Sequence, residues 1–241
     1  MKLNILTKKY PDILKKDILS EDLIFFCRNG LKENNSEVEE ELLFLIKSKN
    51  WSWYSRDIDS NIILTYPVFH GAKKIVSYLI ESGKYNIKEY NPTLSKALCA
   101  SISLKGEQML DYLLTQEMNK KYIDDLIIKS FIFASKVDDE DYKNLYLSFS
   151  NKIIQSCDFD NTMKGIIYYV NPIIFNYFLL NHPLSNKEKI THTNKFLNEY
   201  EHFGMKFKSV ADKIEIIKRL EVFTCLEEMP INKKNNKINK V

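Results

Sequence analysis

The stretch Gly71-Ala-Lys-Lys-Ile-Val-Ser-Tyr-Leu-Ile-Glu-Ser-Gly83 decides the expected fold. Ile75, Val76 and Leu79 lie at helical spacing, and a glycine stands at each end of the stretch. Apolar residues also recur at helical spacing in the rest of the 241 residues, whereas the alternating patterns typical of strands are short. The sequence therefore predicts an all-α protein.

The apolar pattern around this stretch recurs at a period near 33 residues. The template consists of Leu64, Ile75, Val76, Tyr78, Leu79 and Ile80. Shifts of 34, 67 and 99 residues give three further sets, which are Leu98, Met109, Leu110, Tyr112, Leu113 and Leu114; Phe131, Tyr142, Lys143, Leu145, Tyr146 and Leu147; and Met163, Ile174, Phe175, Tyr177, Phe178 and Leu179. Lys143 alone breaks the apolar pattern, so we expect about four related units.

A period of this length with two short helices per unit resembles the ankyrin repeat. Asp57-Ile-Asp59 stands at the turn of that pattern, Gly71 between the two helices and Gly83 at the close of the unit. The Thr-Pro-Leu-His start of the family pattern is replaced by Ile62-Ile63-Leu64-Thr65. The resemblance covers residues 57–188. It implies a solenoid of stacked helix-turn-helix units with helical caps at both ends.

Four parts of the chain follow from this resemblance. Residues 1–56 form a helical N-terminal cap, which either is a simple cap or includes a divergent repeat around residues 42–46. Residues 57–188 form about four degenerate ankyrin-like repeats. Residues 189–228 form a helical C-terminal cap, and residues 229–241 form a disordered basic tail. Capping boxes are expected at Ser36-x-x-Glu39, Ser185-x-x-Glu188 and Ser209-x-x-Asp212, and a helix start at Asn171-Pro172.

The charge balance argues against a nucleic-acid partner. The tail holds four of the 35 basic residues and no acid, so the remaining chain has 35 − 4 = 31 basic residues against 32 acidic ones. A single-strand binder that stacks bases on Trp51, Trp53 and Tyr54 stays an alternative. We favour instead a plug of these aromatic side chains between the N-terminal cap and the first clear repeat.

The residues that could carry catalysis form no complete motif. The four cysteines Cys27, Cys99, Cys157 and Cys225 include no CxxC pair, so neither a metal nor a cofactor is expected. Cys157-Asp-Phe-Asp-Asn-Thr162 resembles the aspartate loop of haloacid-dehalogenase-type phosphatases, but Asp212 is the one aspartate that follows it. We assign Asp158 to a repeat turn, because it lies 99 residues after Asp59. A helical enzyme with a Cys–His or an acidic site stays the alternative function.

The resemblance implies a protein–protein interaction scaffold rather than an enzyme, with partners bound through turn tips and the exposed face of each first helix. The positions carried over are Asp59, Asn61, Phe69 and His70 in the first unit, Thr93, Ser95 and Ser103 in the second, and Asp158, Asp160, Tyr168 and Tyr169 in the fourth. Of these, Tyr168 and Tyr169 are the strongest candidates, because large aromatic side chains supply contact area at low entropic cost.

The sequence also bears on location and partners. Six glycines are few for a doubly wound nucleotide-binding fold, and no apolar run is long enough for a signal peptide or a membrane span. The chain resembles effector-type ankyrin proteins of intracellular bacteria or of large DNA viruses. We therefore expect a monomer in the cytoplasm, or one that is secreted into a host cell without an N-terminal signal, with a protein as its partner.

Overall fold

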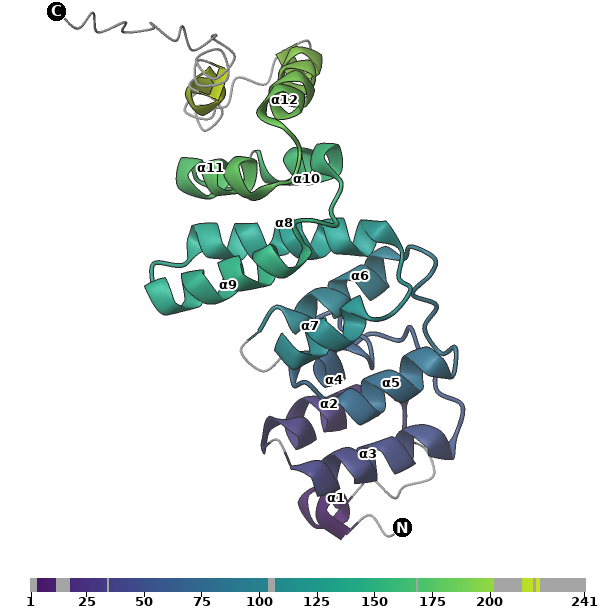
Figure 1. Ribbon diagram of the computed structural model, residues 1–241. Coiled ribbons are helices and arrows are strands. Elements are labelled where there is room, and N and C mark those ends of the chain that lie inside the picture. The colour runs from purple at the N-terminus through teal and green to yellow at the C-terminus, as the bar shows by residue number, and fades with distance from the viewer. Residues whose placement is uncertain are drawn as a thin grey trace, which may run out of the picture. The chain divides into compact units, whose positions relative to one another are not determined.

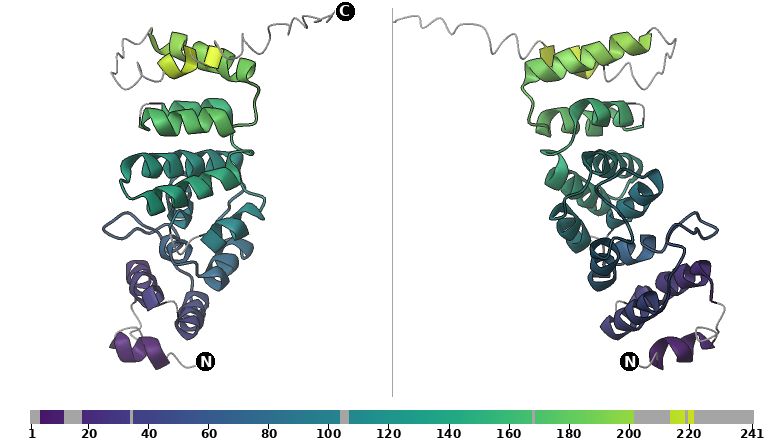
Figure 2. Two further views of the ribbon diagram at one scale, coloured as in Figure 1. Left: turned by 60° about the vertical axis from the view of Figure 1, so that its left-hand side comes forward. Right: turned by 90° about the vertical axis from the view of Figure 1, so that its right-hand side faces the viewer.

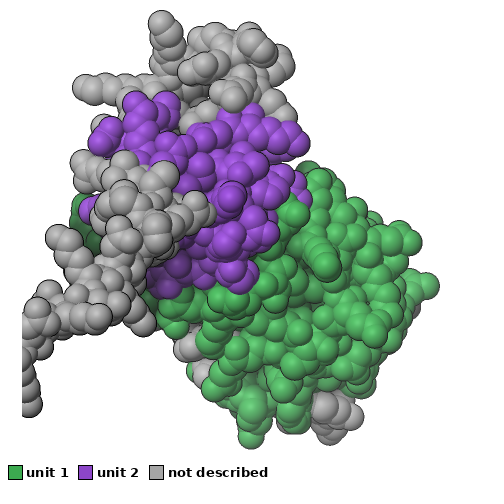
Figure 3. Space-filling view, turned by 45° about the horizontal axis from the view of Figure 1, so that its top comes forward, with its two compact units in different colours: residues 1–158 green, residues 159–241 purple. Residues whose placement is uncertain are grey.

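The structure, a computed structural model, describes residues 4–11, 18–33, 35–103, 107–167, 169–201, 214–218 and 220–221. Helices are the regular structure of this part of the chain, and no strand occurs in it (Figure 1). The expected all-α class is confirmed. The chain divides into two compact units, residues 1–158 and residues 159–241, which Figure 3 colours separately.

In chain order, the described residues of each unit form the following helices. Those of the first unit are α1 (Asn4–Lys9), α2 (Ser20–Gly30), the 3-10 helix η2 (Leu31–Glu33), α3 (Ser36–Ser48), α4 (Thr65–Phe69), α5 (Lys73–Glu81), α6 (Pro92–Leu98), the 3-10 helix η3 (Cys99–Ser101), α7 (Glu107–Leu114), α8 (Lys120–Lys136) and α9 (Glu140–Ile153). Those of the second unit are α10 (Phe159–Ile166), α11 (Pro172–Asn181) and α12 (Asn186–Glu201), and residues 214–218 are helical too.

The helices of the first unit form two rows. In the first row, which consists of α2, α4, α6 and α8, α4 contacts α2 and α6, and α6 contacts α8. In the other row, α3 contacts α5, and Lys152 of α9 donates to Asp111 of α7 over 2.9 Å. Each of α2, α4 and α8 also contacts the helix that follows it in the chain. Consecutive helix pairs therefore lie one after another along this unit (Figures 1 and 2).

The segment around α5 has the turn geometry that its glycines permit. Gly71 and Gly83 have φ angles of 71° and 70°, a region that side chains with a Cβ rarely adopt. Gly71 reverses the chain between α4 and α5, and Gly83 follows the last turn of α5. Four residues of the template form its core positions and are buried, namely Leu64, Ile75, Val76 and Leu79.

Two of the three shifted sets match the structure at their core positions. The buried members of the 34-residue shift are Leu98, Met109, Leu110 and Leu113, and those of the 99-residue shift are Met163, Ile174, Phe175, Phe178 and Leu179. In the template and in the 34-residue shift, the half-buried tyrosine lies under a lysine of the preceding helix in the same row. The Lys47 ammonium is 4.8 Å from the Tyr78 ring centre, and the Lys73 ammonium is 5.4 Å from that of Tyr112.

The shift of 67 residues is wrong for the second helix of its unit. Tyr142 is 43% exposed, whereas the buried residues of α9 are Phe149, Ser150 and Ile153. These three follow Ile75, Val76 and Leu79 by 74 residues. Because α8 has 17 residues and α9 has 14, against five in α4 and nine in α5, the added length moves the core register toward the end of α9.

Acidic side chains of α3 cap neighbouring helices. The buried Glu41 carboxylate accepts from the backbone N–H groups of Ile5, at 3.0 Å, and Leu6, at 2.8 Å, in α1. The Glu39 carboxylate accepts from the backbone N–H of Lys74 at 2.8 Å, at the start of α5. Carboxylates stabilise helix N-termini, where backbone N–H groups lack partners within the helix.

The expected helix starts have mixed outcomes. The box at Ser36 is wrong, because Asn35 caps α3 and its side chain accepts from the Glu37 N–H at 2.8 Å. The box at Ser185 is confirmed, since the Ser185 N–H donates to the Glu188 carboxylate at 2.9 Å and the Glu188 N–H donates back to the Ser185 hydroxyl. Asn171 caps α11 through the Ile174 N–H, as expected. The Ser209 box and the tail lie outside the described residues.

In the aromatic segment before α4, Trp51 belongs to the core of the first unit and Trp53 packs against it, whereas Tyr54 is 44% exposed. Trp51 is 5% exposed, and its indole N–H donates to the Ile46 carbonyl over 2.9 Å. The buried Tyr85 donates its hydroxyl to the Trp53 carbonyl. Trp51 is therefore part of a plug and has no exposed face for stacking a base.

The connections between helix pairs are joined by buried polar contacts. Tyr122, at the start of α8, is fully buried. Its hydroxyl donates to the Glu89 carbonyl at 2.7 Å and accepts from the Asn91 N–H at 2.8 Å. The Asn119 N–H donates to the Ile87 carbonyl at 2.9 Å. These bonds fix the turn before α6 against the start of α8.

Replacement of Tyr122 by Phe should destabilise the protein by about 1–2 kcal/mol, because the ring stays in place while the Glu89 carbonyl and the Asn91 N–H lose their partner. Urea unfolding followed by circular dichroism measures the change. Tyr142→Phe is the matched control, since Tyr142 is exposed, and it should change stability by less than about 0.5 kcal/mol. Equal stabilities of the two variants would contradict the role given to the Tyr122 hydroxyl.

Candidate functional site

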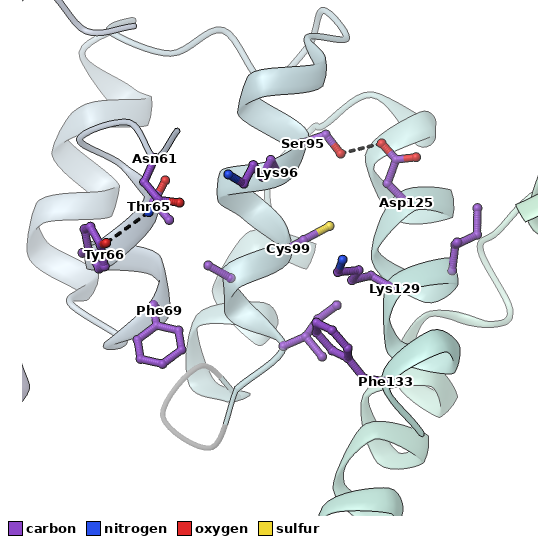
Figure 4. Close-up of a pocket in the computed structure, with 13 residues that line it drawn as sticks. Asn61, Thr65, Tyr66, Phe69, Ser95, Lys96, Cys99, Asp125, Lys129 and Phe133 are labelled. Carbon is purple, nitrogen blue, oxygen red and sulfur yellow. Dashed lines mark hydrogen bonds between the residues drawn. The ribbon is translucent and has the colours of Figure 1, made fainter. Parts of the chain in front are cut away.

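A groove of about 590 Å³ runs across the first-row helices α4, α6 and α8 (Figure 4). The segment around α4 contributes Asn61, Thr65, Tyr66 and Phe69. The α6–η3 segment contributes Ser95, Lys96, Cys99, Ala100 and Ile102. Helix α8 contributes Asp125, Ile128, Lys129 and Phe133. The lining is mostly apolar with a few charged groups, a composition typical of binding sites.

The Asp57 carboxylate organises the turn that leads into α4. It accepts from the backbone N–H groups of Asp59, at 3.0 Å, and Asn61, at 2.8 Å, and from the Tyr66 hydroxyl at 3.2 Å. Burial, and then the charge of Asp57, raise the pKa of Tyr66 above its ordinary value. The turn holds Ile58 at its tip with 96% of its surface exposed.

Helix α6 forms the middle of the groove. Asn91 caps it by accepting from the Thr93 and Leu94 N–H groups, and Pro92 is its first residue. This start fixes the helix so that Lys96 and Cys99 face the groove (Figure 4). The Lys96 ammonium donates to the Asp59 carbonyl over 2.9 Å, which ties α6 to the turn of the preceding pair.

Helix α8 closes the groove with residues four positions apart. The Asp125 carboxylate accepts from the Tyr90 hydroxyl at 2.8 Å and from the Ser95 hydroxyl. Burial and the hydrogen bond to Asp125 raise the pKa of Tyr90 to about 12. One turn along, the Lys129 ammonium lies 4.9 Å from the ring centre of Phe133. The Ser95–Asp125 pair therefore lies at one end of the groove, and the rings of Phe69 and Phe133 lie at the other (Figure 4).

Two thiols of the first unit, those of Cys27 and Cys99, have raised pKa values that make them poor nucleophiles. Burial raises the pKa of Cys27 to about 12. Burial and the nearby Asp125 carboxylate raise the pKa of Cys99 to about 12 as well. Nucleophilic catalysis needs the thiolate, which a lowered pKa supplies. In the second half of the chain, the Cys157 thiol donates to the Ile154 carbonyl, and Cys225 lies outside the described residues.

Part of the expected binding set lies at this groove. Asn61, Phe69 and Ser95 line it, although Ser95 is buried and bonded to Asp125 rather than exposed as its position suggests. Ser103 donates to the Phe69 carbonyl at 3.0 Å, and Asp59 pairs with Arg28 at 2.9 Å.

Other expected residues lie away from the groove. His70 lines a separate small cavity beside Asn35, and the Thr93 hydroxyl accepts from the Arg56 guanidinium at 2.6 Å. The Asp158 N–H donates to the Asp124 carboxylate at 2.8 Å. In the second unit, Tyr169 is 63% exposed. Tyr168 falls outside the described residues.

The phosphatase-like loop has no strand before it in the described structure. Asp158, at the position of the nucleophile, follows helix α9 and comes directly before α10. Asp160 lies in the first turn of α10, and its carboxylate is 2.8 Å from Nδ1 of His192 in α12. An aspartate nucleophile of that enzyme class requires a strand-to-loop junction, which a helix does not supply. The described residues also contain no group of three His, Cys, Asp or Glu side chains placed to hold a metal ion.

Three important groove residues were missed in the sequence, namely Asp125, Lys129 and Phe133. Their spacing of four residues places them on one face of a helix, and this periodicity was the available signal. None of the described helices is long and apolar enough to cross a membrane. No protein-family model, curated protein or solved structure matches the chain. A function for the groove therefore rests on its own geometry.

Alkylation of Cys99 by iodoacetamide should be roughly 1000-fold slower at pH 7.5 than that of a free thiol, whose pKa is about 8.5. Because the raised pKa keeps the thiol protonated, the rate should climb about tenfold for each pH unit up to pH 10. Mass spectrometry of the Cys99 peptide measures the rate, with glutathione as the reference. A rate that levels off near pH 8.5 would show an ordinary or activated thiol instead.

Proposed function

We propose that this chain is a protein-recognition module of the ankyrin-like type, which binds a segment of a partner protein in the groove over α4, α6 and α8. The observation that carries the proposal is that three successive first-row helices line one groove with both apolar and polar side chains. Phe69, 44% exposed, stands at one wall of it. An exposed aromatic side chain beside a groove is a typical anchor for a partner.

The ankyrin-like arrangement is supported by the spacing of contacts along the chain. Side-chain hydrogen bonds between helix pairs join residues about one period apart, such as Lys74 to Glu40, Lys96 to Asp59 and Tyr122 to Glu89, which are 34, 37 and 33 positions apart. In a stack of repeats each unit contacts its neighbours only, so separations near the repeat length are expected.

A protein segment fits this surface better than a small molecule does. The groove continues from Tyr66 and Phe69 to the turn that Asp57 organises. At the tip of this turn, Ile58 is almost completely exposed. A small molecule that fills the groove would leave this tip in water, whereas an extended partner would cover both.

The alternative of a Cys–His enzyme is less well supported, because the pKa values of Cys27 and Cys99 are raised rather than lowered. The proposal also states that the protein is a monomer and acts in a host cell, as the resemblance to effector-type ankyrin proteins implies. The groove accounts for how such a protein would hold its target and leaves the identity of that target to experiment.

Selection of a phage-displayed library of random 12-residue peptides on the full chain tests the proposal. Peptides that bind the protein should lose about tenfold or more in affinity to Phe69→Ala and to Phe133→Ala, because each change removes an aromatic wall of the groove. Fluorescence polarisation with the selected peptides measures the affinities.

Tyr142→Ala is the matched control for this selection, since it removes an exposed aromatic ring of α9 in the other row. It should leave the affinities unchanged. If the selected peptides bind the Phe69 and Phe133 variants as tightly as the original chain, or if the control alone weakens them, the groove is not the recognition surface.

A further inference from the structure

The charged side chains of the groove differ in how many hydrogen bonds they already make within the protein. Asp125 is the one carboxylate among the lining residues, and it already accepts hydrogen bonds from the hydroxyls of Tyr90 and Ser95. Two donors on a partly buried carboxylate stabilise its charge within the protein. Both hydroxyls donate to the same oxygen, Oδ2, so the charge of Asp125 already has partners within the protein.

The two lysines of the groove differ in the same respect. Lys96 donates to the carbonyls of Asp59 and Ser60, so its ammonium serves the neighbouring turn. No ion pair of Lys129 with a described carboxylate is found, and its ammonium lies against the ring of Phe133 and near the Cys99 thiol. Lys129 is thus the cation of the groove whose ammonium is available to a ligand.

The surroundings of Lys129 favour an anion that sits beside an apolar side chain. Lys129 and Cys99 extend toward each other between α6 and α8, and Phe133 lies next to Lys129 at the aromatic end of the groove (Figure 4). Ile128 adds apolar surface from the same helix. A charge-assisted bond to Lys129 would be strengthened by this apolar lining, because the effective dielectric constant is lower there than in water.

We infer that the partner segment carries an Asp or Glu carboxylate that pairs with Lys129, directly next to a large apolar side chain that packs against Phe133. This inference rests on the groove being the recognition surface and adds the chemistry of the ligand. The charge of Lys129 selects the acidic residue, and the ring of Phe133 selects the apolar one. A basic side chain at the same place is disfavoured, because it would lie beside the like charge of the Lys129 ammonium.

Four bead-bound pools of 12-residue peptides test this chemistry with the full chain. Their central pairs are Phe-Glu, Phe-Gln, Phe-Lys and Ala-Glu, and all other positions are randomised. The fraction of fluorescently labelled protein that each pool retains is measured at 50 mM and at 500 mM salt. The original chain should prefer Phe-Glu over Phe-Lys about tenfold at low salt and less at high salt, because salt screens the partly exposed pair.

A variant with the opposite charge at position 129 gives the more direct test. Lys129→Glu should reverse the preference, so that Phe-Lys is retained better than Phe-Glu. Lys120→Glu is the matched control: it changes the net charge equally on the same helix, but it lies nine residues away, on the opposite side of α8, and outside the groove lining. This control should keep the preference for Phe-Glu.

The results separate this inference from the proposed function. Equal retention of Phe-Glu and Phe-Lys, or an unchanged preference in Lys129→Glu, overturns the acidic ligand. Equal retention of Ala-Glu and Phe-Glu overturns the apolar neighbour. If phage selection yields peptides that depend on Phe69 and Phe133 but lack acidic residues, the groove remains a recognition site and the ligand chemistry inferred here is wrong. Absence of groove-dependent peptides from that selection counts against the proposed function itself.

Discussion

A helix of five or seven residues does not persist alone in water, and the first-row helices α4 and α6 have five and seven residues. Isolated helices become marginally stable only at about 12–15 residues, because nucleation costs more than one hydrogen bond returns. These helices therefore depend on the apolar side chains that neighbouring pairs place against them. Leu64, Val68 and Leu98 are fully buried under such neighbours.

This dependence also fixes the geometry of the groove. Asp57, Asn91 and Tyr122 hold the turns that begin or join the first-row helices, so the outward side chains of α4, α6 and α8 keep constant distances from one another. Ser95 and Asp125 bond across two of these helices within the groove itself. A binding site whose residues come from supported helices loses little entropy when a partner binds.

The features that local chemistry determines could be predicted from the sequence. The glycines at positions 71 and 83, the capping residues Ser185 and Asn171, and the buried template residues of α5 are examples. Each of these depends on backbone conformation or on helical spacing, which neighbouring residues in the sequence specify. The all-α class follows from the same local signals.

Features that depend on the neighbouring pair were missed or misplaced. Glu39 serves the start of α5 rather than a box with Ser36, and Ser95 bonds to Asp125 instead of facing solvent. The expected register of α9 is wrong for a related reason, because one of its core positions is Ser150, a buried polar residue that an apolar pattern does not include. A period found in apolar residues predicts contacts about one period apart. It does not specify which polar side chains bond to each other 30 or 37 positions apart, or how far a helix is lengthened.

The central claim is that contacts in residues 1–158 pass from one helix pair to the next. Zero-length carbodiimide cross-linking of the full chain, read by mass spectrometry, tests it directly, because it joins lysines only to carboxylates already in contact. The structure predicts links from Lys74 to Glu40, from Lys88 to Glu117 and from Lys152 to Asp111, whose atoms lie 2.5, 2.7 and 2.9 Å apart. Absence of these links together with abundant links between α3 and α9 would contradict a stack of neighbouring pairs.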